Sequence, residues 1–398
     1  MAGSHIFHEL PLTHYDRALK IRPNMWEYLQ KDVEYLRLGG THTPIASVDD
    51  FSESNLSACV EHYVDATVLG FAASSGIPIS DIAPVVKKMP QMTLLIHGIV
   101  SDYHNILNFE LFGRKTFYFG INLSEHLLAT ELSVDSSLLM PPFDSCMFVY
   151  TAPSVVETAF AFMKVQAEPV DLLYPVSVYI TSLPDKTSNN GRKILMAVSH
   201  WRGDQYSFYI KREVAIRPGW KIEKSLQTDW EALGDTDGEG LRLTSDGDNR
   251  TTTDEEFYTD GLDLFRLILN SILYLSSNDP DIIERTSGRS VAIKRAQSIK
   301  SALKAKKARQ TANKESTLDY YSVGESVSPI YIDKHALHDS NNSQLNKFKE
   351  YAIRFIVRGH WRNQPCGQHF TERKLIWIKP YYKGPEMTGL VSRPYIVK

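Results

Sequence analysis

Residues 176–217 carry the pattern that most restricts the fold, because apolar and polar side chains alternate there over three successive runs. A period of two is typical of strands with one buried face. Asn190-Gly191 lies between the first two runs and supplies the positive φ angles that a tight hairpin turn requires. Arg202-Gly203-Asp204 separates the second run from the third. The pattern therefore predicts a three-stranded antiparallel meander.

Helical periodicity and further strand patterns occupy the rest of the chain. Residues 262–275 are apolar nearly all round, which predicts a buried helix. Other helices are predicted at 14–37, 54–73, 78–88, 92–109 and 124–132, and other strands at 114–119, 147–150, 327–332, 352–357 and 373–379. We expect an α+β fold with a helical N-terminal part and an antiparallel sheet core that a C-terminal β-hairpin completes.

The predicted elements divide the chain into four segments. Residues 1–110 form a mainly helical domain, and 111–283 form an α+β domain with the meander and the buried helix. Residues 284–318 are a basic linker or helix, and 319–398 supply C-terminal strands that complete the sheet core. A length of 398 residues exceeds what one ordinary core organises.

Composition excludes several classes of protein. The net charge of −3 argues against a globally basic coat for nucleic acid, so any anion site must be a local patch. Three widely spaced cysteines form no CxxC pair, which argues against a disulfide scaffold and a zinc knuckle. No run approaches the ~18–20 apolar residues that span a bilayer. We expect a cytoplasmic protein without a membrane partner, a metal or a cofactor.

Two segments of opposite charge follow the meander. Residues 229–256 contain ten acidic and two basic side chains, which predicts a mobile surface loop. Residues 285–314 contain ten lysines and arginines and no acid, so they could neutralise phosphates or simply form a solvated helix or linker. The acidic segment could also pair with the basic one. Residues 235–246 nearly fit a calcium loop, but the ligand types at its fifth and twelfth positions argue for a solvated loop.

The tripeptide His-Trp-Arg occurs twice, at His200–Arg202 and at His360–Arg362, each time after an apolar run. An imidazole, an indole and a guanidinium at the end of a strand suit the holding of a nucleobase or a phosphate. Two histidines can divide the roles of acid and base between them. The first copy therefore gains weight as a site only if His200 and His360 are neighbours.

The C-terminal copy lies in the richest set of candidate residues, in a loop that two predicted strands, 352–358 and 373–379, would flank. RNA cleavage needs groups that move protons and a cation beside the phosphorane. His360, Arg362 and Arg373 are the candidate catalytic residues, with His360 as acid or base and the arginines on the phosphate. The candidate nucleic-acid contacts are Trp361, Arg358, Gln364, Lys374, Lys379, Tyr381, Lys383, His200 and Arg202. Trp361 would stack on a base.

The same C-terminal residues carry a resemblance to a known group of proteins. They are Ile356–Pro365, Gly367, Arg373, Trp377-Ile378, Pro380-Tyr381 and Lys383-Gly384-Pro385. This run resembles the C-terminal signature of a family of uncharacterised proteins that occur in bacterial, plasmid and phage genomes. Residues 113–132 with 141–143, and 270–279, resemble the same family more weakly. The resemblance implies a setting in phages or mobile elements rather than a particular chemistry, and Cys366 with residues 368–370 departs from the family's glycine-rich loop.

Two functions from different classes remain open on these residues. One is a nucleic-acid-directed protein of a bacterial or phage conflict system, acting on RNA or DNA as a metal-independent ribonuclease-type toxin. The other is a non-enzymatic module whose Arg-, Trp- and Tyr-rich hairpin docks a protein partner, since these residues are also favoured at protein interfaces. A structural reading has Trp361 in the core. Geometry discriminates: a catalytic site brings His360, Arg362 and Arg373 into one cleft, whereas an interface spreads them over a flat patch.

Overall fold

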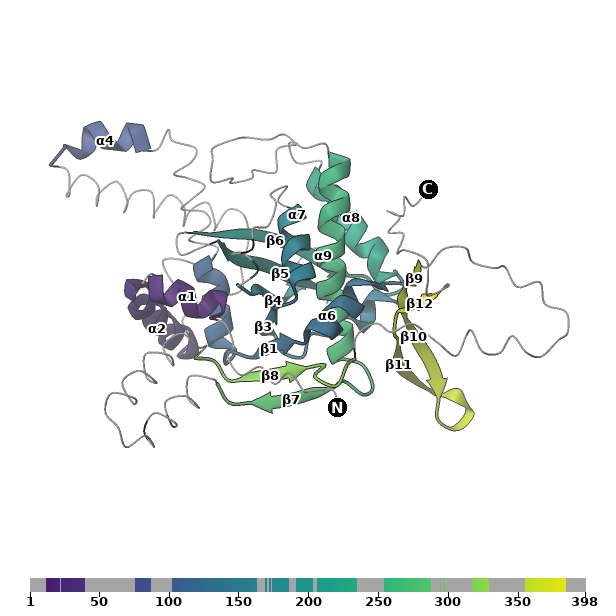
Figure 1. Cartoon of the computed structure of the whole chain (residues 1–398). Coiled ribbons are helices and arrows are strands. Elements are labelled where there is room, and N and C mark those ends of the chain that lie inside the picture. Colours follow the sequence, from purple (N-terminus) through teal and green to yellow (C-terminus); the bar gives the residue numbers. More distant parts are fainter. Residues whose placement is uncertain are drawn as a thin grey trace, which may run out of the picture.

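A computed structural model gives the fold (Figure 1). It describes residues 12–21, 23–39, 76–86, 102–162, 174–185, 191–202, 206–234, 254–287, 317–328 and 355–383, with isolated positions at 169, 172, 294 and 297. The fold is α+β, as the sequence predicts, and is built around one large sheet. None of the helices within these residues is long and apolar enough to cross a membrane.

The central sheet has seven strands in the order β6-β5-β4-β3-β1-β8-β7. The strands are β1 (Thr116–Phe119), β3 (Ser145–Tyr150), β4 (Val176–Asp185), β5 (Gly191–Arg202), β6 (Tyr206–Ile216), β7 (Ile282–Arg285) and β8 (Tyr320–Val323). β1 runs parallel to both β3 and β8, and every other pair is antiparallel. The predicted meander is confirmed, since β4, β5 and β6 pair in sequence order.

Helices cover both faces of this sheet, and the strand residues alternate between them. Along β3, Phe148 and Tyr150 face a core shared with α6 (Ile121–Leu128), α7 (Pro153–Phe162), α8 (Ile222–Gly234) and α9 (Asp254–Leu275). Met147 and Val149 face the opposite core, which includes α1 (His14–Ile21), α2 (Pro23–Arg37) and the helix over residues 102–111. Burial on both faces explains why β3 is a nearly continuous hydrophobic run after Ser145 instead of alternating with polar residues. A further helix, α4, spans Ile79–Val86.

The N-terminal helices are attached to the sheet by buried polar contacts. Asp16 of α1 accepts hydrogen bonds from the Thr13 backbone N–H (3.1 Å) and from the Thr317 N–H (2.9 Å) just before β8. Tyr15 donates to Glu110 of the 102–111 helix. Burial and the adjacent Glu110 carboxylate raise the pKa of the Tyr15 phenol. The Asp16–Thr317 bond joins residues that are 301 positions apart in the chain.

Several predicted elements need correction. The helix expected at 14–37 is two helices, because Pro23 begins a new one. The helix expected from residue 124 begins at Ile121 and ends at Leu128, and the short strand β2 (Thr130–Glu131) follows it. Most of the strand expected at 327–332 lies outside the described residues, and a strand that was not predicted, β8, spans Tyr320–Val323.

The acidic segment 229–256 also differs from the prediction at its two ends. α8 continues to Gly234, and α9 already begins at Asp254, so both ends are helical. Strand β7 was not predicted at all. The helix predicted at 54–73, the turns of the meander and most of the basic segment lie outside the described residues. The four predicted domain boundaries stay a prediction.

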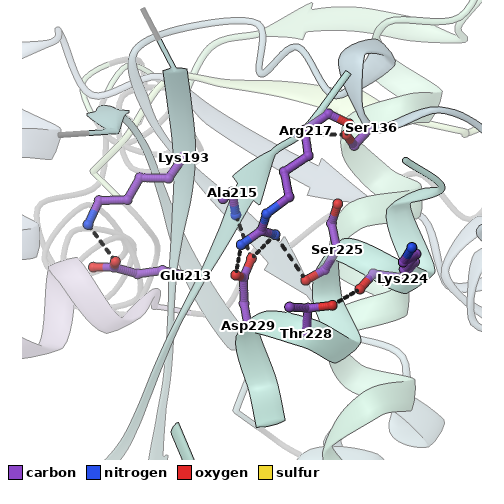
Figure 2. A network of polar contacts seen from close by, with 9 residues as sticks. All are labelled: Ser136, Lys193, Glu213, Ala215, Arg217, Lys224, Ser225, Thr228 and Asp229. Carbon is purple, nitrogen blue, oxygen red and sulfur yellow. Dashed lines mark hydrogen bonds and ion pairs between the residues drawn. The ribbon is translucent and has the colours of Figure 1, made fainter. Parts of the chain in front are cut away.

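A polar network joins α8 to the edge strand β6 (Figure 2). Asp229 of α8 accepts two hydrogen bonds from the Arg217 guanidinium and a third from the Ala215 backbone N–H (2.7 Å). Ser136 donates to the Arg217 carbonyl oxygen at 2.7 Å. The paired carboxylate raises the pKa of the Arg217 guanidinium, although partial burial opposes that shift. This network gives the first acidic residue of the 229–256 segment a structural role.

We expect Asp229→Ala to lower the free energy of unfolding by about 1–3 kcal/mol, because it leaves a partly buried guanidinium and a backbone N–H without their acceptor. Urea denaturation followed by circular dichroism measures the change. Arg192→Ala is the matched control. Its bond to Asp144 joins two largely exposed side chains, so a change within ~0.5 kcal/mol is expected there. Equal effects of the two substitutions would contradict a structural role for the network.

Candidate functional site

The C-terminal hairpin is formed by β10 (Gly359–Cys366) and β11 (Glu372–Ile378), which pair antiparallel and extend away from the body of the protein (Figure 1). β10 also pairs parallel with β2, giving a three-stranded sheet. A separate pair, β9 (Phe355–Val357) with β12 (Tyr381–Lys383), lies beside the base of the hairpin. The predicted loop around His360 is therefore a strand, and its partner is β11 and not β9. The polar residues after Trp361 gave no clear strand pattern in the sequence, because only one face of β10 packs against the rest of the protein.

Trp361 points inward and ties the hairpin to the main core. It is 3% exposed, and its indole N–H donates to the Asn270 side-chain oxygen of α9 at 2.7 Å. Asn270 in turn donates to the carbonyl oxygens of Leu127 (3.0 Å) and Thr130 (2.8 Å). The indole thus fills the core and satisfies a buried amide. It presents no face on which a base could stack, so we leave Trp361 out of the candidate site.

Trp377 of β11 lies opposite Trp361 and completes the inward face. The two indoles stack with centroids 6.1 Å apart, and the Trp377 N–H donates to the Thr130 hydroxyl at 3.2 Å. Gly359 begins β10 where no side chain fits, because an added Cβ would lie 2.7 Å from the Thr130 hydroxyl oxygen. Its N–H donates to the Ala129 carbonyl at 3.0 Å. These contacts fix the base of the hairpin against the α6–β2 turn.

The outward face of the same sheet is exposed to solvent. Residues directly opposite each other in antiparallel strands share a face, and His360 opposes Ile378, Arg362 opposes Ile376 and Gln364 opposes Lys374. Glu131 of β2 is in register with His360 and is also exposed. We call this set the hairpin face: Glu131, His360, Arg362, Gln364, Lys374, Ile376 and Ile378.

The register separates the three predicted catalytic residues. Arg373 opposes Pro365 and shares its strand face with Leu375 and Trp377, whereas His360 and Arg362 lie on the opposite face. All three side chains are exposed. The geometry thus brings His360 and Arg362 together and directs Arg373 away from them. The three residues therefore do not converge in one cleft, and only His360 and Arg362 share an exposed face.

The other predicted contact residues are scattered. Lys379 lies over the Trp377 ring, 5.9 Å from its centroid, and Arg358 is exposed just before β10. Tyr381 on β12 is 38% exposed. Lys383 and Arg202 lie in described strands, but their side chains lie outside the described part of the structure.

His200 is fully buried in β5, in a different sheet from His360. Its ring packs edge-on against Phe160 of α7, and its Nδ1 lies 3.3 Å from the Pro175 carbonyl oxygen, to which it can only donate. The two His-Trp-Arg copies therefore occupy different environments. His200 contributes to the main core, and the hairpin face does not include it.

Sequence reasoning missed two residues that define the site. Glu131 joins the hairpin face because β2 pairs parallel with β10, more than 200 positions later in the chain. No local sequence pattern predicts such a pairing. Asn270 could have been found, because a lone amide inside the apolar 262–275 run must meet a partner when the helix is buried. Within the described residues, no group of three or more His, Cys, Asp or Glu could hold a metal ion.

The hairpin region is strongly basic although the whole chain is not. Residues 355–383 contain six lysines and arginines and a single acid, Glu372. Local excess charge of this kind attracts anionic surfaces over roughly a Debye length, about 8–10 Å at physiological salt. The C-terminal segment is therefore locally basic, although the chain as a whole carries a net charge of −3.

These features define an α+β protein with a projecting hairpin. One face of the hairpin packs against the main core, and the other is exposed to solvent. The chain belongs to the AcrVA2-like family, described as the anti-CRISPR type V subtype A2 family, whose model matches residues 119–382. The matched segment includes α6, α9 and the whole hairpin. No curated protein and no solved structure matches the chain. The predicted origin among phage or mobile-element proteins of a conflict system is thereby confirmed.

We expect Trp361→Phe to lower the free energy of unfolding by about 1–3 kcal/mol, because the substitution leaves the buried Asn270 oxygen without its donor. Chemical denaturation of the two proteins tests this. Arg362→Ala, one position along the same strand but on the exposed face, should change stability by no more than ~0.5 kcal/mol. A tolerated Trp361→Phe would contradict the role of Trp361 as the anchor.

Proposed function

We propose that this protein antagonises a type V CRISPR system by binding a protein component of that system through the hairpin face. The proposal rests on one observation above all: a rigid sheet presents exposed isoleucines flanked by cations. The proposed role corresponds to the non-enzymatic alternative of the sequence analysis, in which the hairpin docks a protein partner. The family description supports the type of system, and the surface chemistry supports the type of contact.

The composition of the hairpin face favours a protein partner. Ile376 and Ile378 are 37% and 36% exposed, and each lies directly opposite a polar residue of β10, Arg362 or His360. An apolar centre with a polar rim that includes arginine is typical of protein interfaces. Aliphatic side chains give no platform for bases, and both indoles of the hairpin point inward. The partner surface we expect is apolar with an acidic rim.

Because the inward face of the hairpin packs against the core, less conformational entropy is lost when the outward face binds a partner. Ordering of loops and side chains opposes association, but β10 is already fixed by Trp361, by Gly359 and by its pairing with β2. Bound and free states therefore need not differ much in backbone conformation. Such a preorganised strand pair can convert a modest contact area into useful affinity.

The test measures binding to a purified type V effector protein without guide RNA, chosen as one whose plasmid interference this protein blocks in cells. Arg362→Glu and Ile376→Ser should each weaken binding at least ~10-fold, as expected for central interface residues. Lys221→Glu, an exposed cation on the α8 side of the main sheet, is the control and should bind as the wild type does. Thermal denaturation should show all three variants folded.

Cys366 gives a second measurement on the unmodified chain. It is partly exposed at the end of β10 and in register with Glu372, so bound effector should slow its alkylation, located by peptide mass spectrometry. Cys146 is fully buried, and burial raises the pKa of its thiol, so it should stay unlabelled in both states. Binding that survives both face substitutions, with unchanged Cys366 labelling, would refute the proposed surface.

RNA cleavage is the second candidate, because the register places a carboxylate beside His360. Neighbouring strands lie ~4.8 Å apart, so Glu131 and His360 are adjacent on the exposed face, and Arg362 follows on the same side. Glu131 would take the proton of a ribose 2′-hydroxyl, whose oxygen attacks phosphorus. His360 would give a proton to the departing 5′-oxygen while Arg362 offsets the charge. The products are a 2′,3′-cyclic phosphate and a 5′-hydroxyl.

Incubation with total RNA at two salt concentrations tests the second candidate. If it holds, Glu131→Gln and His360→Ala should each reduce cleavage by roughly 10²-fold or more, while Arg373→Ala, on the opposite face, should have little effect. Cyclic-phosphate ends in the products would identify the reaction. Cleavage that is absent, or unchanged in His360→Ala, would remove catalysis and leave binding alone.

A further inference from the structure

The tip of the hairpin displays an aromatic side chain to solvent. A 3-10 turn, Gln368–Phe370, connects β10 to β11, and none of its residues is buried. Phe370 is 73% exposed, more than any other exposed large aromatic residue of the described chain. This turn lies at the outermost end of the projecting hairpin (Figure 1).

The backbone of this turn is held in an uncommon conformation. His369 and Phe370 both have φ = 57°, in the left-handed region that residues other than glycine rarely adopt. Gly367 precedes them with φ = 76°. Two hydrogen bonds close the turn: the Phe370 N–H donates to the Gly367 carbonyl (3.3 Å), and the Thr371 hydroxyl donates to the Gln368 carbonyl (3.0 Å). The chain thus fixes the position from which Phe370 projects.

Neither the left-handed backbone conformation of Phe370 nor its exposed ring stabilises the turn. Glycine would adopt the left-handed conformation at lower cost, and a polar side chain would be better solvated than a phenyl ring. Backbone strain that the surroundings maintain is concentrated at ligand clamps and other functional sites. A strained, exposed aromatic residue at a fixed position is what a binding anchor requires, because its ring is displayed before the partner arrives.

We infer that Phe370 is an anchor that inserts its ring into an apolar pocket of the partner protein. This inference rests on the proposed function and extends the hairpin face to its tip. Arg373 and Lys374 follow the turn and are exposed, so the pocket should carry carboxylates on its rim. The side chain of Glu372, the one acid of this region, lies within 3.0–3.2 Å of a Cβ built on Gly367 and so folds back over the turn.

A protein pocket fits this tip better than a nucleobase does. The same hairpin also exposes Ile376 and Ile378, which the polar residues 371–374 separate from Phe370, and a surface that combines one aromatic with aliphatic side chains is complementary to an apolar protein surface. Single-stranded nucleic acid is instead bound by successive aromatic platforms. Trp361 and Trp377, which could have continued such a platform, face the core.

Phe370→Gly separates an anchor from a structural residue. The substitution relieves the left-handed strain, so the melting temperature should stay the same or rise. Binding to the guide-free type V effector protein should nevertheless fall at least ~10-fold, and Phe370→Trp should largely restore it. Phe112→Ala, a control at another exposed aromatic residue (40%) after the 102–111 helix, should bind as the wild type does.

The outcomes distinguish this inference from the proposed function. If Phe370→Gly binds normally while Arg362→Glu and Ile376→Ser do not, the anchor is refuted and the hairpin face stands. If none of these substitutions matters, both are refuted. Guide RNA alone, measured in parallel, should show no Phe370-dependent binding. Loss of RNA binding with retention of protein binding in Phe370→Gly would overturn the protein pocket in favour of base stacking.

Discussion

The amide of Asn270 is the contact on which the candidate surface depends. It lies in the buried helix α9 and bonds the Trp361 indole on one side and the carbonyl oxygens of Leu127 and Thr130 on the other. A buried amide that lost any of these partners would pay its desolvation cost uncompensated. One side chain thus holds together three parts of the chain: the long helix of the main core, the α6–β2 turn and the first strand of the hairpin.

This attachment gives the hairpin two different faces. On the inward side, Trp361 is buried and Trp377 is partly buried, and their N–H groups donate to the Asn270 side-chain oxygen and the Thr130 hydroxyl. On the outward side, Arg362 and Ile376 are paired across the strands, and both side chains are exposed. A strand pair cannot turn over without losing the inward contacts, so the identity of the exposed residues is set by the core. Surface chemistry in this protein is a consequence of packing beneath it.

Much of the main sheet could be predicted because its signals are local. The meander follows from alternation and turn residues within 176–217, and the buried part of α9 follows from the mostly apolar residues 262–275. The candidate site was harder to predict from the sequence. The prediction grouped His360, Arg362 and Arg373, whereas the pairing of β10 with β11 puts His360 and Arg362 on one face and Arg373 on the other. A shift of one residue in register exchanges the two faces of a strand, and sequence patterns leave that shift open where one face is solvated.

The sequence by itself determined the α+β class, the meander, the buried helix and the basic character of the C-terminal region, because each depends on residues close together in the chain. Only the tertiary structure decided that Trp361 belongs to the core, that Glu131 joins His360, and that Phe370 stands exposed at the tip. The physical reason is that burial and strand register come from contacts between distant segments. Those contacts determine which of the candidate residues are exposed to solvent and which are buried.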